Sequence, residues 1–222
     1  MKLISTRRQT AAPNTMLFTL ALAAALSVSG CASVGAPEKS STMTAFEQLS
    51  VQPDGTRSWR STAAAKVSAV YIDPQAIVFA ADIRINDEQR QALRQTLSDA
   101  LARQFSEAGV RVVVTPDAPS DAAAITVRAN ITAVELSDPA LNVVSAILLF
   151  IPVSRGSMSV EIEALAMKDS EPKGQRIAAM AFSGTAGVTN IGSAFSGVGH
   201  AKLQADIAAT KFVALVTGMP QK

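Results

Sequence analysis

The chemistry available to this sequence is limited by its single histidine, His200. A hydrolytic enzyme needs a nucleophile beside a base, and histidine is the usual base. Ser183 and Ser196 lie near glycines, but an alanine stands two positions before each, so neither matches a nucleophile elbow. His200 falls at the expected start of the last helix, where we expect it to be exposed. We therefore predict that the protein is not an enzyme.

Carboxylates are the remaining candidates for metal binding. Glu161 and Glu163 are two residues apart on an expected strand and so point the same way. A cation site is one interpretation, but a solvated strand face explains the pair more simply, and we predict no metal site. The glycines of residues 184–199 match neither dinucleotide-binding nor phosphate-loop spacing, so we predict no cofactor.

Trp59 is the single tryptophan of the chain and Tyr71 the single tyrosine. Trp59 could contact a ligand or a partner. Packing of the leading segment of the domain onto the sheet is the explanation that we favour.

Cys31 is the only cysteine, and it follows a segment typical of an export signal. Residues 1–30 begin with Lys2, Arg7 and Arg8 and continue into the apolar run of residues 16–26. Val28, Ser29 and Gly30 with Cys31 resemble the lipobox of bacterial lipoproteins, in which signal peptidase recognises the small residues and the cysteine sulfur carries diacylglycerol. A buried apolar cysteine is the alternative. Met16 could also be the true start, and the lipobox would then be unchanged.

The lipobox resemblance implies a location as well as an anchor. Several acyl chains hold a protein firmly, because each buried CH₂ contributes about 0.8 kcal/mol. Ala32 and Ser33 follow the cysteine, and the absence of aspartate there implies sorting to the outer membrane. We expect the folded domain to face the periplasm.

Removing residues 1–30 takes the formal net charge from +2 to −1, because that part holds three basic residues and no acid. Such a chain lacks the basic patch that nucleic acid requires, so we predict no nucleic-acid partner. Residues 31–54 are rich in Ser, Thr, Ala, Pro and Gly, which indicates a lipidated, flexible tether. Residues 55–222 are expected to form a single domain.

Hydrophobic periodicity predicts the elements of that domain. A strand at residues 66–74 should stop at Asp73 and Pro74, and a helix should begin after the cap Asn86 and end at Gly109. Its apolar stripe comprises Leu93, Leu97, Leu101 and Phe105. Four further strands are expected within residues 110–115, 125–133, 157–169 and 175–188, the last three as an antiparallel meander.

A second helix is expected from His200 to Gly218, with Leu203, Ile207, Phe212 and Leu215 broadly on its buried side. The order β-α-β-β-β-β-α predicts an α+β fold. We expect a mixed, mainly antiparallel sheet of about five strands with the helices packed on one face.

Residues 139–154 carry no charge and connect two expected strands. A membrane-spanning helix needs about 20 apolar residues, so this run is too short to cross a bilayer. It is expected to begin as a helix near Pro139. Its apolar residues face nearly all directions, which indicates either a core helix or an exposed contact for a partner or the membrane surface. The contact residues would be Ile147, Leu148, Leu149, Phe150 and Ile151.

Several stretches of the chain resemble a family of bacterial lipoproteins catalogued as domain of unknown function 3313. They are "FEQLSVQPDGTRSWR" (residues 46–60), "VYIDP" (70–74), "ITAVELSDPALNVVS" (131–145) and "SVEIEALAMKDSEPKG" (159–174). The resemblance implies a lipid-anchored cell-envelope protein without an established activity.

The resulting hypothesis is a non-enzymatic adaptor, or an assembly or regulatory lipoprotein, that is attached to the membrane through its lipid anchor. It would bind another envelope protein or a second copy of itself. The alternative is a carrier or sensor of an apolar ligand such as a lipid.

Overall fold

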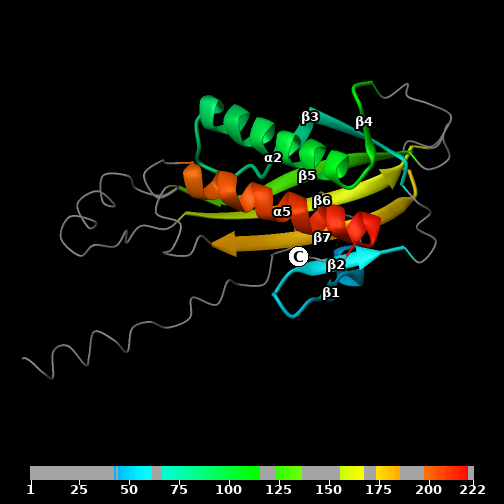
Figure 1. The fold of residues 1–222 in the computed structure, drawn as a ribbon. Helices are drawn as coiled ribbons and strands as arrows, with labels where there is room; N and C mark the ends of the chain where they lie inside the picture. The colour runs from blue at the N-terminus through cyan, green and yellow to red at the C-terminus, as the bar shows by residue number, and fades with distance from the viewer. Residues whose placement is uncertain are drawn as a thin grey trace, which may run out of the picture. The chain divides into compact units, whose positions relative to one another are not determined.

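A computed structural model describes residues 43, 45–61, 67–115, 124–136, 156–167, 174–185 and 198–219. These residues belong to one compact unit, Val34–Lys222. Two helices, α2 (Asp87–Glu107) and α5 (Gly199–Thr217), lie side by side on one face of a seven-stranded mixed sheet (Figure 1). The α+β class and the placement of both helices on one face agree with the prediction.

The centre of the sheet is an antiparallel meander of β5 (Ala124–Glu135), β6 (Ser157–Ala166) and β7 (Arg176–Thr185). On one side of the meander, β3 (Ala69–Phe79) runs parallel to β5 and to the short edge strand β4 (Arg111–Val113). The expected order β-α-β-β-β-β-α is therefore present from β3 to α5.

The prediction of about five strands was too low because two short strands precede β3. They are β1 (Ser50–Val51) and β2 (Arg57–Arg60), and they extend the sheet beyond β7 in the order β1-β2-β7-β6-β5-β3-β4. A tight turn at Pro53–Gly55 joins them, with Gly55 at φ 80°. The single-turn helix η1 (Phe46–Gln48) comes just before β1. Residues 45–54 of the expected tether thus form η1, β1 and this turn.

The expected end of a strand at Pro74 was wrong, since β3 continues to Phe79. The pairing of β3 with β5 shifts register between Ile72 and Ile77, and Pro74 lies within this bulge. Proline has no N–H to donate to a ladder, so a bulge is a place where a strand accepts it. The amide of Gln75 instead donates to the Asp73 carboxylate at 2.8 Å.

Helix α2 follows the predicted pattern. The Asn86 side chain accepts from the Gln89 amide at 2.8 Å, and the Gln89 side chain accepts from the Asn86 amide at 3.0 Å, which completes a capping box. Leu93, Leu97, Leu101 and Phe105 are all fully buried. Gly109 follows the helix at φ 76°, a conformation that glycine adopts without a steric penalty.

Helix α5 ends at Gly218 as predicted, with this glycine in the left-handed conformation, but its buried stripe is displaced from the expected one. Of the four residues expected on the buried side, Phe212 is fully buried and Leu203, Ile207 and Leu215 are only partly buried. Small residues, Ala201, Ala205, Ala208 and Ala209, lie in the contact instead. Their small side chains allow the helix to approach its neighbours closely.

The main core lies between this helical layer and the sheet. It contains the α2 stripe, Phe212 and alternate residues of the central strands, such as Ile125, Ile131, Met158, Ile162 and Met180. We call this side of the sheet the helix face and the opposite side the open face.

Several expectations fall outside the described residues. They include Cys31 with Val28, Ser29 and Gly30, the segment 139–154 with its contact residues 147–151, and Ser196. Within the part of the chain that the structure describes, neither α2 nor α5 combines the length and hydropathy that crossing a bilayer requires.

Candidate functional site

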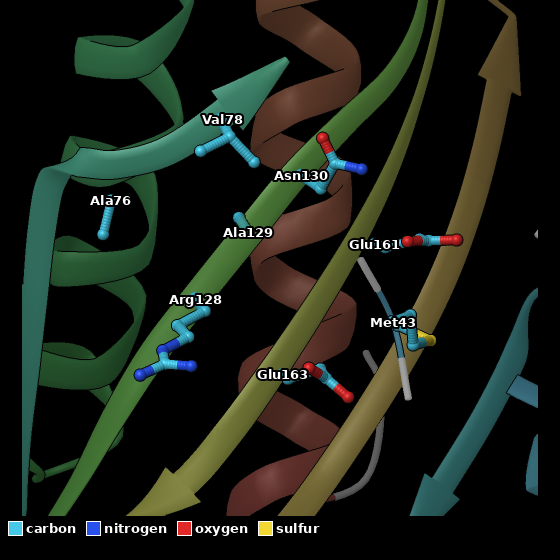
Figure 2. Close-up of a pocket in the computed structure, with 8 residues that line it drawn as sticks. All are labelled: Met43, Ala76, Val78, Arg128, Ala129, Asn130, Glu161 and Glu163. Carbon is cyan, nitrogen blue, oxygen red and sulfur yellow. The ribbon is translucent and has the colours of Figure 1, made fainter. Parts of the chain in front are cut away.

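The open face of the sheet contains a cleft of about 200 Å³. We call it the open-face cleft, and Figure 2 shows it from the side opposite the helices. It is lined by Met43, Ala76, Val78, Arg128, Ala129, Asn130, Glu161 and Glu163. These residues come from β3, β5 and β6 and from the segment that precedes η1.

The cleft has a small-residue wall on β3 and a polar wall on β5 and β6. Ala76 and Val78 lie at the end of the β3 bulge and just after it, where the strand regains its pairing with β5. In the register of the sheet, Asn130 is opposite Glu161 and Arg128 is opposite Glu163. Side chains at such positions share one face of the sheet, so the four polar groups line the same cleft.

The expectation that Glu161 and Glu163 form a solvated strand face was wrong for Glu161. The two glutamates do share a face, as the spacing predicted, but only 3% of Glu161 is exposed. Met43, which is 4% exposed, lies beside the pair (Figure 2). The segment around Met43, far upstream in the chain, thus covers part of a sheet face that strand periodicity alone predicts to be exposed to solvent.

Glu163 lies between two arginines but is paired with one of them. In Figure 2, Arg128 points toward β3, whereas Glu163 points toward β7. Arg176 on β7 forms the ion pair, with its Nη1 at 3.6 Å from Glu163 Oε1. Burial raises the pKa of Glu163 above its ordinary value of 4.5, and the charge of Arg176 offsets this only in part. The folded protein therefore disfavours the ionised form of Glu163.

The covering segment comprises Met43 and residues 45–49, and we call it the strap. Met43, Phe46 and Leu49 form a second buried cluster with Ala179 and Ala181 of β7, and Trp59 of β2 packs against it. The two alanine side chains are small, and the larger side chains of the strap pack over them. The expected packing of the leading segment and Trp59 on the sheet is confirmed.

Two arginines hold the strap at its polar edges. The guanidinium of Arg57 lies 5.5 Å from the ring centre of Phe46. Arg176 stacks on Trp59 at 4.6 Å and donates a hydrogen bond to the Gln48 side chain. Cation–π contacts of this kind contribute about 0.5–1 kcal/mol each at exposed sites. Arg176 therefore connects the strap, β2 and the cleft carboxylate Glu163.

A second cleft, of about 460 Å³, lies between the β1–β2 turn and α5. It is lined by Gln52, Pro53, Asp54, Thr56, Ser58, Met180, Lys211 and Leu215. Asp54 is ion-paired with Lys211 at its rim. Burial would raise the pKa of Asp54, but hydrogen bonds from Lys211 and Thr56 outweigh burial and lower it.

His200 is not the exposed helix-end residue that we expected. It is 2% exposed, and its Nδ1 accepts a hydrogen bond from the Gly156 amide at 2.8 Å. Ser183 lies on the open face and shares a hydrogen bond of 2.7 Å with Ser159, whereas His200 belongs to α5 on the helix face. The structure therefore does not bring this serine and the histidine together.

The described side chains also offer little for metal binding. Within the described ranges, no three His, Cys, Asp or Glu side chains converge on one point. Glu161 and Glu163 adjoin Asn130 and the two arginines, an arrangement in which positive and negative charges are balanced.

Comparison with known proteins places the chain in a family. The profile of the family described as "Protein of unknown function (DUF3313)" matches residues 38–212. The chain belongs to this family. The matched region contains the strap, every described strand of the sheet and all the lining residues of the two clefts except Leu215, so these are parts of the family domain. No curated protein sequence matches the chain.

Solved structures with a similar arrangement are remote in sequence. One is the PelC dodecamer from Paraburkholderia phytofirmans, with 14% identity and a TM-score of 0.44, covering 75% of this chain and 98% of that chain. Another is the hypothetical protein CT253 from Chlamydia trachomatis, with 11% identity and a TM-score of 0.41, covering 69% and 99%. A DUF4136 family protein from Bacteroides thetaiotaomicron has 7% identity and a TM-score of 0.38, covering 71% and 96%.

Sequence reasoning found Glu161 and Glu163 as a pair but missed Arg128, Asn130, Arg176 and the strap. One signal was available. Arg128 and Asn130 occupy the polar positions of one alternating strand, and Glu161 and Glu163 occupy those of the next. If these two strands pair, the four polar side chains can lie on the same face of the sheet. The strap had no comparable signal, because three apolar residues spaced three apart are too few to predict which surface they cover.

Proposed function

We propose that the protein is a lipid-anchored cell-envelope adaptor, attached to the outer membrane through Cys31 with its domain facing the periplasm. The observation that carries the proposal is the run Val28-Ser29-Gly30-Cys31 at the end of a basic and then apolar export signal. Membership of a family without an assigned role is compatible with this proposal. The adaptor would bind another envelope protein or a second copy of itself, with residues 147–151 as its contact.

The clefts favour an adaptor over a carrier of lipid. The open-face cleft is lined by charged Arg128, Glu161 and Glu163. An acyl chain in such a cleft would leave these groups without water, and burying a charge without compensation costs several kcal/mol. The cleft beside α5 has the ion pair of Asp54 and Lys211 at its rim. Neither described cleft has the apolar lining that a lipid carrier requires.

The anchor is tested by feeding cells labelled palmitate. The wild-type chain should incorporate the label and fractionate with the outer membrane, whereas Cys31→Ser should do neither. Ser40→Ala, in the same segment, is the matched control and should behave as wild type. Absence of label in the wild-type protein, or a wild-type chain that is soluble in the cytosol, would overturn the proposal.

The adaptor role is tested separately by crosslinking in cells, followed by pull-down and mass spectrometry. A stoichiometric protein partner should be captured with wild type and lost with Leu148→Asp combined with Leu149→Asp, while circular dichroism shows a folded domain. Lipid that co-purifies with the domain, in place of a protein, would support the carrier. Loss of folding in the double variant would show that residues 147–151 belong to the core.

A further inference from the structure

His200 lies at a junction of three elements. It is in the first turn of α5, and it is the one histidine of the chain. The partner amide belongs to Gly156, directly before β6, and β5 ends beside it at Glu135. A side chain added at Gly156 would place its Cβ at 2.7 Å from His200 Cβ and at 2.9 Å from the Glu135 carbonyl oxygen. The junction is therefore closely packed, and only glycine fits at position 156.

The hydrogen bond defines the protonation state of the ring. The Gly156 N–H donates to Nδ1 at 2.8 Å, so Nδ1 must present a lone pair and the proton of the neutral ring must be on Nε2. If Nδ1 were protonated, its N–H would face the N–H of Gly156, and two donors cannot form a hydrogen bond with each other. Because His200 is 2% exposed, water cannot readily replace the lost partner.

We propose that His200 is a protonation-sensitive latch between α5 and β6. With a neutral ring, the latch holds the first turn of α5 against the start of β6. Protonation of Nδ1 removes the bond to Gly156 and places a cation at a helix N-terminus, where the helix dipole disfavours positive charge. Acidification therefore releases the first turn of α5 from the sheet. The device depends on neither Cys31 nor a partner.

The charged groups that the structure describes near the junction are either exposed or paired with other residues. Glu135, at the end of β5, is exposed, and its carboxylate accepts a hydrogen bond from Ser157 at 3.3 Å. Lys202 on α5 is also exposed, and its positive charge disfavours protonation of the ring. Three charged groups of α2 are paired with other residues: Arg94 with Ile77, Asp99 with Gln95, and Arg103 with Asp206. On β7, the residue packed against α5 near this end is Gly184, which contacts the uncharged Gln204.

The direction of the pH effect follows from which state binds the proton better. The folded state requires an unprotonated Nδ1, whereas a histidine in the unfolded chain takes up a proton with an ordinary pKa of about 6.5. Below that pH the unfolded state binds more protons, so stability falls as the pH falls. The latch is fully formed above about pH 6.5 and is lost on acidification.

Two substitutions distinguish the effect of the His200–Gly156 hydrogen bond from the effect of removing a buried side chain. In His200→Asn, the side-chain oxygen can take the place of Nδ1 and accept from Gly156, but it does not titrate. In His200→Gln, the polar end lies near the position of Nε2 and cannot accept that bond in the same place. The asparagine variant is therefore the matched control for the glutamine variant.

The experiment measures the folding equilibrium constant of the full chain in detergent by urea denaturation, from pH 7.5 to 5.0. Below about pH 6.5 the wild-type constant should fall relative to that of His200→Asn by up to about tenfold per pH unit. The glutamine variant should be the least stable of the three at pH 7.5. Parallel pH profiles of wild type and His200→Asn would overturn the proposal.

A second measurement on the wild-type protein does not depend on folded variants. Imidazole nitrogen resonances at pH 7.5 should show the proton on Nε2, and the Gly156 amide should be protected from hydrogen exchange. This protection should be lost at pH 5.5 before the amides of β6 exchange. A ring protonated at Nδ1 at pH 7.5, or a Gly156 amide equally protected at both pH values, would contradict the latch.

Discussion

The two faces of the sheet are built from the same strands but are stabilised differently. On the helix face, a continuous apolar cluster spans both helices and all the central strands. On the open face, the strap forms a small apolar cluster on β7 and β2, beside a cleft lined by charged residues. Adjacent β7 residues illustrate the contrast, since Met180 packs in the helix-face core and Ala179 and Ala181 lie under the strap.

The comparison indicates where the structure can change without unfolding. Phe212 lies in a core closed by two long helices, so its surroundings can be released only by global unfolding. The strap is short and lies at the beginning of the described domain, and such segments open locally at lower free energy than core elements. We therefore regard the helix-face core around Phe212 as the scaffold, and we expect local changes at the strap and at the first turn of α5.

The largest predicted effect contrasts one phenylalanine from each face. Phe212→Ala leaves a cavity in the helix-face core and should lower the free energy of unfolding by about 3–5 kcal/mol. Phe46→Ala should lower it by only about 1–2 kcal/mol, near the centre of the range for single substitutions, because the strap can detach and limit the loss. Urea denaturation at pH 7.5 measures both values. Equal losses would show that the strap unfolds together with the core.

An intermediate effect is expected from Glu163 in the open-face cleft. Because its pKa is raised, ionisation of Glu163 is less favourable in the folded state than in the unfolded state. The stability that the protonated group contributes is present below the ordinary pKa of 4.5 and is lost as the pH rises through the raised value. Glu163→Gln should therefore be more stable than wild type at pH 7, with the difference disappearing toward pH 4.

The Glu163 prediction is measured by thermal unfolding from pH 4 to 8. Glu47→Gln is the control, since Glu47 is an exposed residue of the strap. A Glu163→Gln variant that is less stable than wild type at pH 7 would mean that the ion pair with Arg176 outweighs the burial of the carboxylate.

The smallest effect is expected from the exposed ion pair between the helices. Arg103 Nη2 on α2 lies 2.6 Å from Asp206 Oδ1 on α5, and both side chains are about half exposed. Exposed pairs of this kind contribute about 0.2–1 kcal/mol, so Asp206→Asn should change the unfolding free energy by no more than that. The change should shrink further at high salt. A loss comparable with that of Phe212→Ala would mean that the ion pair determines how the helices pack.

The elements with a long, regular period were predictable, and the short ones were not. The capping box at Asn86 and the four-residue apolar stripe of α2 are local patterns, and both are present in the structure as predicted. Strands β1 and β2 have two and four residues, too few to show a period, and pairing alone defines them. The turn Pro53-Asp54-Gly55 between them was a usable signal, because these residues favour a tight turn.

Burial at the candidate sites could not be predicted, because it depends on what covers each residue. Glu161 occupies the polar position of an alternating strand, yet it is buried in the fold, with Met43 of the strap beside it. His200 follows a glycine-rich stretch at the start of a helix, and this position predicts an exposed side chain. In the structure it is buried, because Gly156, just before β6, packs against it. The displaced stripe of α5 has a similar cause, since a helix rich in alanine can pack closely on several faces.

The sequence by itself determined the class of the fold, the order of its main elements, the spacing that puts Glu161 and Glu163 on one face, and membership of a family without a known function. These properties are encoded by local periodicity, capping and turn residues. Only the tertiary structure decided that the strap closes part of the open face, that Arg176 pairs with Glu163, and that His200 meets Gly156. Each of these contacts joins residues from different elements of the fold. A local sequence pattern cannot predict which distant segment will exclude water from a given side chain.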